Sequence, residues 1–135
     1  GEGVEQAIGT PGERFNPLGE FERAGVPVTI SSDAPVADPR PLEAIQAAAT
    51  RITRRGHQLG SDDLAVSVDT AVRGHTISAA RALGREDDLG SLEAGKRADF
   101  AVLTQDPYHT ELSAIARIGV AQTWVGGQPV YVKGA

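Results

Sequence analysis

Apolar residues recur at helical spacing through the first half of the chain, between short stretches of glycine, proline and polar residues. Pro17 suits the first turn of a short helix, which Gly25 would end. The spacing predicts a second helix over residues 42–55, with arginines in its last turns beside the negative end of the helix dipole. Two further short helices are expected over residues 67–74, with Ser67 as N-cap, and over residues 76–83.

One run in this half has a different pattern. Val26-Pro27-Val28-Thr29-Ile30 is rich in β-branched residues and predicts a strand that is buried on both faces. Such a strand needs neighbours to pair with, and the pattern predicts no other strand nearby. We therefore expect the partner strands to lie upstream, which would make this chain an excised fragment. The absence of methionine from the sequence agrees with that expectation.

In the second half the pattern changes to short strands. Strands are predicted at residues 99–103, 120–125 and 129–132, with a helical turn at 111–117. The last two strands are joined by Gly126-Gly127-Gln128, where glycine supplies the positive φ angles of a hairpin turn. The N-terminal residues 1–14 show no period, and we expect a loop or a frayed end there.

Composition narrows the class of protein. The chain has 135 residues and 40% hydrophobic residues, enough for one modest core in a globular protein. Its formal net charge of −5 argues against a nucleic-acid partner and against binding to an anionic membrane surface. No apolar run approaches the roughly 20 residues that span a bilayer. With no cysteine, the chain can form neither a disulfide nor a thiolate metal site, and we expect a cytoplasmic protein.

Asp33 is the candidate for chemistry, because it directly follows the predicted buried strand. In α/β barrels that end of the strands carries the active site, where a carboxylate can bind a metal or take a proton from metal-bound water. A loop aspartate can equally accept backbone hydrogen bonds and shape a turn, and the pattern alone leaves both interpretations open. The three histidines, His57, His75 and His109, have no metal-ligand spacing, so we expect structural roles for them.

Four segments of the sequence resemble, in their order and spacing, elements of a known enzyme superfamily. The first is Ala24-Gly25-Val26-Pro27-Val28-Thr29-Ile30-Ser31-Ser32-Asp33-Ala34-Pro35-Val36, which resembles the last barrel strand of the amidohydrolase superfamily. Residues 76–84 are similar to the helix that follows in that superfamily, and residues 120–131 to its closing strands. The run Leu89-Gly90-Ser91-Leu92-Glu93-Ala94-Gly95-Lys96-Arg97-Ala98-Asp99-Phe100-Ala101-Val102-Leu103 resembles a characteristic element of amidohydrolase family 3, the YtcJ-like branch.

The resemblance implies an α/β fold, in which this chain is the C-terminal fragment of a (β/α)8 metallohydrolase barrel plus strands of a small β-sandwich. Residues 1–88 would hold the last strand and helices of the barrel, and residues 89–135 the sandwich part. Asp33 matches the family's aspartate that binds metal and shuttles a proton. The remaining ligands of the divalent metal, expected to be zinc, would lie upstream of Gly1. Lys96 would lie in a sandwich turn, exposed to water, and is a poor candidate for a carboxylated metal-bridging lysine.

The function implied is metal-dependent hydrolysis of a non-peptide C–N bond, amide or urea-like, in a small molecule. The isolated chain is expected to be inactive and to bind no metal tightly. The alternatives are a non-catalytic remnant or scaffold module, and a family deaminase or isomerase that uses the same aspartate. The barrel part should also leave an exposed strand edge, for which we expect homodimerisation, swapping or pairing with upstream chain.

Overall fold

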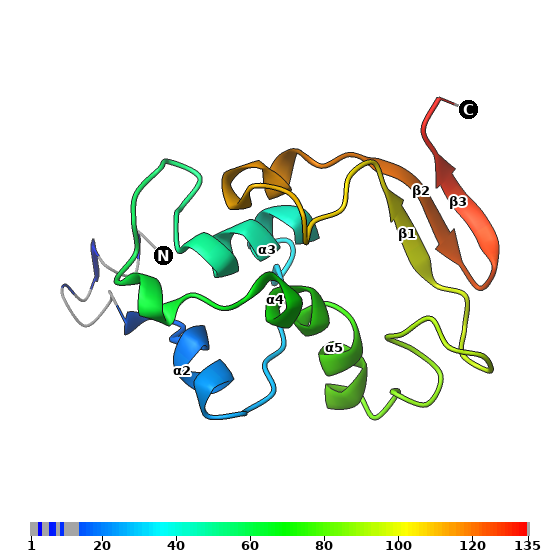
Figure 1. Ribbon diagram of the computed structural model, residues 1–135, viewed down its shortest axis with the longest axis horizontal. Helices are drawn as coiled ribbons and strands as arrows, with labels where there is room; N and C mark the ends of the chain where they lie inside the picture. Colours follow the sequence, from blue (N-terminus) through cyan, green and yellow to red (C-terminus); the bar gives the residue numbers. More distant parts are fainter. Residues whose placement is uncertain (1–2, 4–5, 8, 10–13, 135) are drawn as a thin grey trace.

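A helical half and a three-stranded antiparallel sheet make up the molecule, as Figure 1 shows for the computed structural model, which describes residues 3, 6, 7, 9 and 14–134. This mixture of helix and sheet agrees with the α/β expectation. Most of the N-terminal segment predicted as a loop lies outside the described residues. The elements in chain order are α2 (Leu18–Arg23), α3 (Pro41–Thr50), η2 (Asp62–Leu64), α4 (Val68–Gly74), α5 (Ile77–Ala82), β1 (Phe100–Leu103), η3 (Leu112–Arg117), β2 (Val120–Val125) and β3 (Gln128–Val132).

Local signals in the sequence account for α2 and α4. Pro17 precedes α2, and Gly25 follows it with a φ of +69°, a conformation that glycine adopts at little cost. Ser67 is the N-cap of α4, and its Oγ accepts a hydrogen bond of 3.1 Å from the backbone N–H of Thr70. Both helices therefore begin and end close to the predicted residues.

Helix α3 ends at Thr50, earlier than the predicted end at residue 55. Arg51 has a φ of +59°, a left-handed conformation that stops the helix. Ile52 then pairs antiparallel with Gln58, so a short turn back replaces the last helical turns. The prediction that arginines 51, 54 and 55 lie in the last helical turns is therefore wrong.

The side chain of Arg51 explains why the chain turns there. Only 7% of Arg51 is exposed, and its guanidinium donates to three backbone carbonyls: Leu59 at 3.1 Å, Asn16 at 3.0 Å and Phe15 at 2.8 Å. A buried cation is tolerated when its donors are satisfied in this way, although burial lowers the pKa of Arg51. One side chain thus joins the segment before α2 to the turn after α3.

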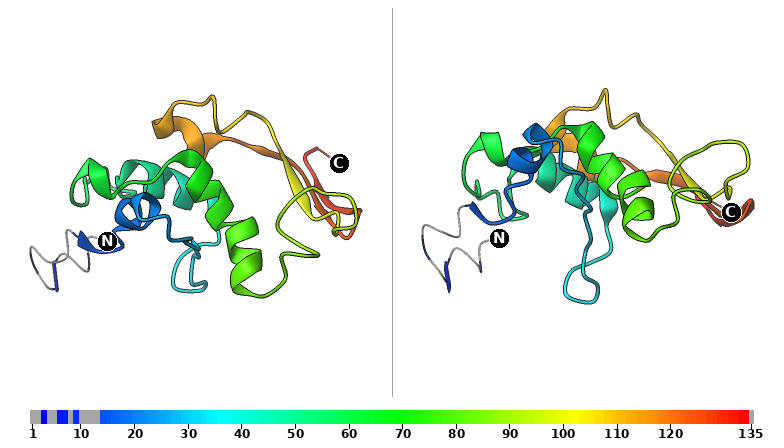
Figure 2. Two further views of the ribbon diagram at one scale, coloured as in Figure 1. Left: turned by 60° about the horizontal axis from the view of Figure 1, so that its bottom comes forward. Right: turned by 90° about the horizontal axis from the view of Figure 1, so that it is seen from below.

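The core lies between α3, α4 and η3, and Figure 2 shows η3 lying against α3 from two further directions. Two of its residues, Ala71 and Ile115, have no exposed surface. Because η3 connects β1 to β2, the sheet is attached to the helices through its own connecting segment. Gln46 Oε1 accepts a 2.9 Å hydrogen bond from the backbone N–H of Ala116 at this contact. The buried residues of the core are Ile45, Ala48, Val66, Ala71, Ile115 and Ile118.

The sheet has the strand order β1-β2-β3, with antiparallel pairing throughout. Gly126 and Gly127 form the predicted hairpin turn with φ angles of +57° and +76°. The ring of Phe100 stacks on that of Trp124, with centroids 5.6 Å apart. Within the described residues, β1 and β3 pair only with β2, so each leaves one edge unpaired.

The strand predicted over Val26–Ile30 is absent: these residues belong to no strand in the part of the chain that the structure describes. Two backbone hydrogen bonds hold the segment, from Val26 N–H to Phe21 at 2.9 Å and from Ile30 N–H to Gly74 at 3.1 Å. A strand requires a neighbour to form a ladder, and the described chain places none beside this run. No helix among the described residues is long and apolar enough to cross a membrane.

We expect Arg51→Ala to lower the free energy of unfolding by about 2–3 kcal/mol, because three backbone carbonyls, that of Leu59 buried and those of Asn16 and Phe15 partly buried, would lose a charged donor. Urea denaturation followed by circular dichroism measures the change. Arg81→Ala, at an exposed arginine of α5, is the matched control and should stay within about 0.5 kcal/mol of wild type. Equal losses in the two variants would contradict the structural role of Arg51.

Candidate functional site

Asp33 lies on a tight turn directly after the extended segment, and it is exposed. Its φ is +54°, its N–H donates to Ser31 Oγ at 3.1 Å, and its carbonyl accepts from Val36 N–H at 2.8 Å. Ser32 Oγ accepts from Ala34 N–H at 3.3 Å, and the Ala34–Pro35 peptide bond is cis. Hydroxyl-to-backbone bonds of this kind fix turns, and here they leave the Asp33 carboxylate available to a ligand.

The described residues do not form a metal site on their own. No group of three or more histidine, cysteine, aspartate or glutamate side chains is arranged to hold an ion in this part of the chain. Asp33 is therefore one donor without companions here. A single carboxylate is too few for tight binding of a divalent metal.

The histidines lie apart from such a site. His109 Nδ1 is 2.7 Å from Asp106 Oδ2 on an exposed turn, and this hydrogen bond is the main cause that lowers the pKa of Asp106. His75 follows α4 as its C-cap, where burial lowers its pKa and favours the neutral ring. His75 lies between α4 and α5 in the chain, in agreement with the structural role expected for it.

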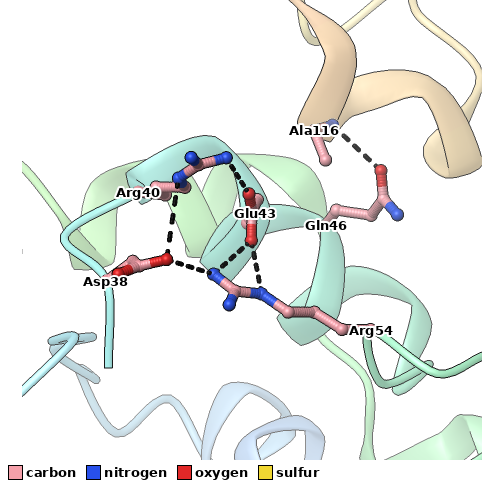
Figure 3. A network of polar contacts seen from close by, with 6 residues as sticks. All are labelled: Asp38, Arg40, Glu43, Gln46, Arg54 and Ala116. Carbon is pink, nitrogen blue, oxygen red and sulfur yellow. Dashed lines mark hydrogen bonds and ion pairs between the residues drawn. The ribbon is translucent and has the colours of Figure 1, made fainter. Parts of the chain in front are cut away.

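The loop that follows Asp33 is fixed by a network of charged side chains (Figure 3). Glu43, in the first turn of α3, accepts from Arg40 Nη1 at 2.9 Å and from Arg54 Nε at 2.7 Å. Arg54 Nη2 also lies 3.4 Å from Asp38 Oδ2. Hydrogen bonding from Arg40, then from Arg54, lowers the pKa of Glu43. The network ties the loop to the start of α3 and to the turn beyond its end.

Glu22 connects α2 to the start of α4, a contact that the sequence pattern does not reveal. Its carboxylate accepts from Ser67 Oγ at 2.6 Å, from Ser67 N–H at 3.2 Å and from the hydroxyl of Thr70. Partial burial raises the pKa of Glu22, but the hydrogen bonds from Ser67 and Thr70 outweigh it and the net pKa is lowered. The helix that precedes the Asp33 segment thus clamps the first turn of α4.

A polar cleft of about 490 Å³ lies between α4, α5 and the loop that leads to β1, and Asp33 is not among its lining residues. Lys96 lines it with only 13% of its side chain exposed, and it donates to Ser91 Oγ at 2.7 Å. Glu93 lies 3.6 Å from the Lys96 ammonium. The expectation that Lys96 is exposed to water is therefore wrong, because Ser91 and Glu93 of the same turn fold over its ammonium group.

Comparison with known proteins assigns the family. The sequence model named "Amidohydrolase family" matches residues 3–131, nearly the whole chain. The chain belongs to the amidohydrolase family. The resemblance drawn from the segments at residues 24–36, 76–84, 89–103 and 120–131 is thereby confirmed.

Relatives within the amidohydrolase family are named as enzymes of C–N chemistry. The N-substituted formamide deformylase of Arthrobacter pascens is 39% identical over 82% of this chain. A 5-methylthioadenosine/S-adenosylhomocysteine deaminase of Thermoanaerobacter pseudethanolicus is 32% identical over 76% of it. Among solved structures, a zinc-bound adenosine deaminase from Xanthomonas campestris superposes with a TM-score of 0.66 over 91% of the chain, at 27% identity.

The chain spans only part of each of these amidohydrolases. It covers 20% of the deformylase, 24% of the first deaminase and 31% of the solved deaminase chain. The activity of the whole protein is therefore a matter for proposal.

We expect Glu22→Gln to lower the free energy of unfolding by about 1 kcal/mol at neutral pH, because a neutral amide accepts more weakly than a carboxylate. The pKa of Glu22 is lowered in the folded state, so this stability is present above the unfolded value of about 4.3 and is lost as pH falls through the folded value. Urea denaturation between neutral pH and about pH 3 should therefore show the two proteins converging in acid.

Glu20→Gln on the same helix is the control, since Glu20 pairs with Arg14 at the surface, where ion pairs contribute little. A difference between wild type and Glu22→Gln that persists unchanged at about pH 3 would show that the charge of Glu22 is not responsible.

Proposed function

We propose that this chain is the C-terminal part of a metal-dependent amidohydrolase that hydrolyses a non-peptide C–N bond, with Asp33 as metal ligand and proton shuttle. Membership of the amidohydrolase family carries the proposal. The local geometry supports the assignment of Asp33, since its turn holds the carboxylate at the surface, free of hydrogen bonds to other described residues. In this proposal the other metal ligands come from the rest of the parent chain.

The chemistry requires one group that can hold a proton next to the reacting bond. When bound, a divalent metal such as zinc lowers the pKa of a water molecule to near neutrality. Asp33 would accept a proton on its carboxylate and return it to the departing nitrogen, so one residue serves first as base and then as acid. Fixed hydrogen bonds at Ser31 and Ser32 would keep the carboxylate in place through both steps.

We place residues 1–88 at the end of a (β/α)8 barrel and residues 89–135 in a small β-sandwich completed by upstream strands. Both open edges of the sheet and the unpaired segment 26–30 support this arrangement. The described residues of the barrel part form no strand, so the strand edge expected there is absent. A homodimer and a cytoplasmic location belong to the same proposal.

The substrate class in this proposal is a small N-substituted amide. The deformylase supports it, with higher identity over more of the chain than the deaminase of Thermoanaerobacter. Deamination of an adenosine-type nucleoside is the second candidate, supported by the superposition on the adenosine deaminase of Xanthomonas. The same aspartate would serve in either reaction, so upstream residues of the substrate pocket would decide between them.

In the full-length parent protein, Asp33→Asn should lower kcat about a thousandfold, because the amide can neither accept nor return a proton. The assay compares hydrolysis of an N-substituted formamide with deamination of adenosine, which also separates the two candidate activities. Glu111→Gln, at an exposed carboxylate directly before η3 and outside the network around Glu43, is the control and should change kcat by less than about twofold. If the full-length protein is active and Asp33→Asn leaves its kcat unchanged, the role proposed for Asp33 is wrong. If the full-length protein shows neither activity, a scaffold function is favoured.

The 135-residue chain alone should bind zinc no tighter than about millimolar, since the described residues bring no three ligands together. Isothermal titration with zinc measures this. A micromolar or tighter site, abolished by Asp33→Asn, would mean that the chain completes a metal site by itself.

A further inference from the structure

The position of Asp33 depends on a segment that has no strand partner among the described residues. From Val26 onward the chain runs extended and exposed at most positions, and its last backbone hydrogen bond before the turn joins Ile30 N–H to the carbonyl of Gly74. That bond is 3.1 Å long and lies three residues before Asp33. Within the described chain, the end of α4 is therefore the last fixed point ahead of the carboxylate.

Gly74 makes this contact sterically possible. A Cβ atom at Gly74 would lie 3.0 Å from Ile30 Cγ1 and 3.2 Å from Ile30 Cδ1, closer than ordinary van der Waals contact. The backbone of Gly74 is helical and its φ is not positive, so its conformation does not require glycine. Glycine in a helix costs up to about 1 kcal/mol relative to alanine. The close approach of Ile30 accounts for a residue that helix propensity disfavours.

The helix cannot easily yield to such a Cβ atom. Glu22 clamps its first turn through Ser67, and Ala71 in its middle has no exposed surface. Ile30 also packs against the buried core to which Ala71 belongs. A Cβ atom at position 74 would therefore push against the Ile30 side chain, which must give way by a few tenths of an ångström, while α4 stays in place.

We propose that Gly74 is a positioning residue for Asp33: by allowing Ile30 to dock on the end of α4, it sets where the carboxylate lies. The functional consequence rests on the role proposed above for Asp33, whereas the geometric coupling between the two positions does not. The coupling can therefore be tested in this chain without any catalytic assay.

The first test is Gly74→Ala in the 135-residue chain, followed by two-dimensional ¹⁵N–¹H NMR. We expect the amide resonances of residues 31–33 to shift and exchange of the Ile30 amide hydrogen to accelerate at least about tenfold, because its hydrogen bond to position 74 is stretched. The thermal midpoint should stay within about 4 °C of wild type, since alanine favours the helix and offsets the lost contact.

Gly119→Ala is a matched control in the other half of the molecule. A Cβ atom there would lie 3.1 Å from Thr104 Oγ1 and 3.2 Å from Thr104 Cγ2, an encounter as tight as that at Gly74. It should leave the resonances of residues 31–33 unchanged. The second control introduces Gly74→Ala into a protein that already carries Ile30→Ala. In that protein only the Cβ atom of residue 30, at 3.6 Å, faces position 74. Adding Gly74→Ala should therefore cause little further shift of the Asp33 resonance.

Unchanged Asp33 resonances in Gly74→Ala, or an equal shift in Gly119→Ala, would overturn the proposal. In the full-length parent, Gly74→Ala should lower kcat about tenfold and leave KM within about twofold, because misplacement of a reacting group acts on the chemical step. If Asp33→Asn leaves that enzyme active, the proposed function fails, while the NMR result still decides the role of Gly74.

Discussion

Burial of Ile115 against α3 holds the two halves of the molecule together. Ile115 has no exposed surface, and the adjacent Ala116 donates its N–H to Gln46 of α3. Because η3 lies between β1 and β2 in the chain, the sheet cannot leave the helices without extracting this side chain from the core. The sheet is therefore anchored through η3, whereas the loop before β1 packs directly against α5 at Gly90.

A second constraint operates around α4, which contacts α2 at its first turn and Ile30 at its end. Glu22 fixes the start of this helix from α2, and Ile30 rests on its end. The charged network around Glu43 fixes the loop on the far side of Asp33. Asp33 is thus held from both directions along the chain, although no described residue contacts its carboxylate through a hydrogen bond. Such an arrangement holds the carboxylate in place and leaves it open to a ligand.

Features that depend on neighbouring residues could be predicted from the sequence. The Ser67 cap and the Gly126-Gly127 turn belong to this group, because a side chain or a φ preference acts over a few residues. The end of α3 could not be predicted, since the left-handed Arg51 is held by carbonyls on remote segments of the chain. The prediction of a strand over residues 26–30 is wrong for a related reason: a β-branched run forms a strand only when a partner strand lies beside it.

The same distinction applies to the candidate site. Asp33 could be located from its place after an extended run and from the family pattern around it. Glu22 and Gly74 could not, because their partners lie 45 and 44 positions away in the sequence (67 − 22 and 74 − 30) and nothing local marks either contact. A predicted N-cap such as Ser67 shows only where a helix begins. It does not indicate which remote carboxylate accepts a hydrogen bond from its hydroxyl group.

Pro129 indicates which edge of the small sheet can better accept a further strand. The pair Val125–Gln128 closes a two-residue turn, so the next pair, Trp124–Pro129, is one whose backbone groups point away from each other. The missing N–H of Pro129 therefore falls on the outer edge of β3, which offers any incoming strand one donor fewer there. Residues 100–103 of β1 contain no proline, and their outer edge is the better template. A further strand would therefore extend the sheet on the β1 side, and β3 would remain its outer boundary.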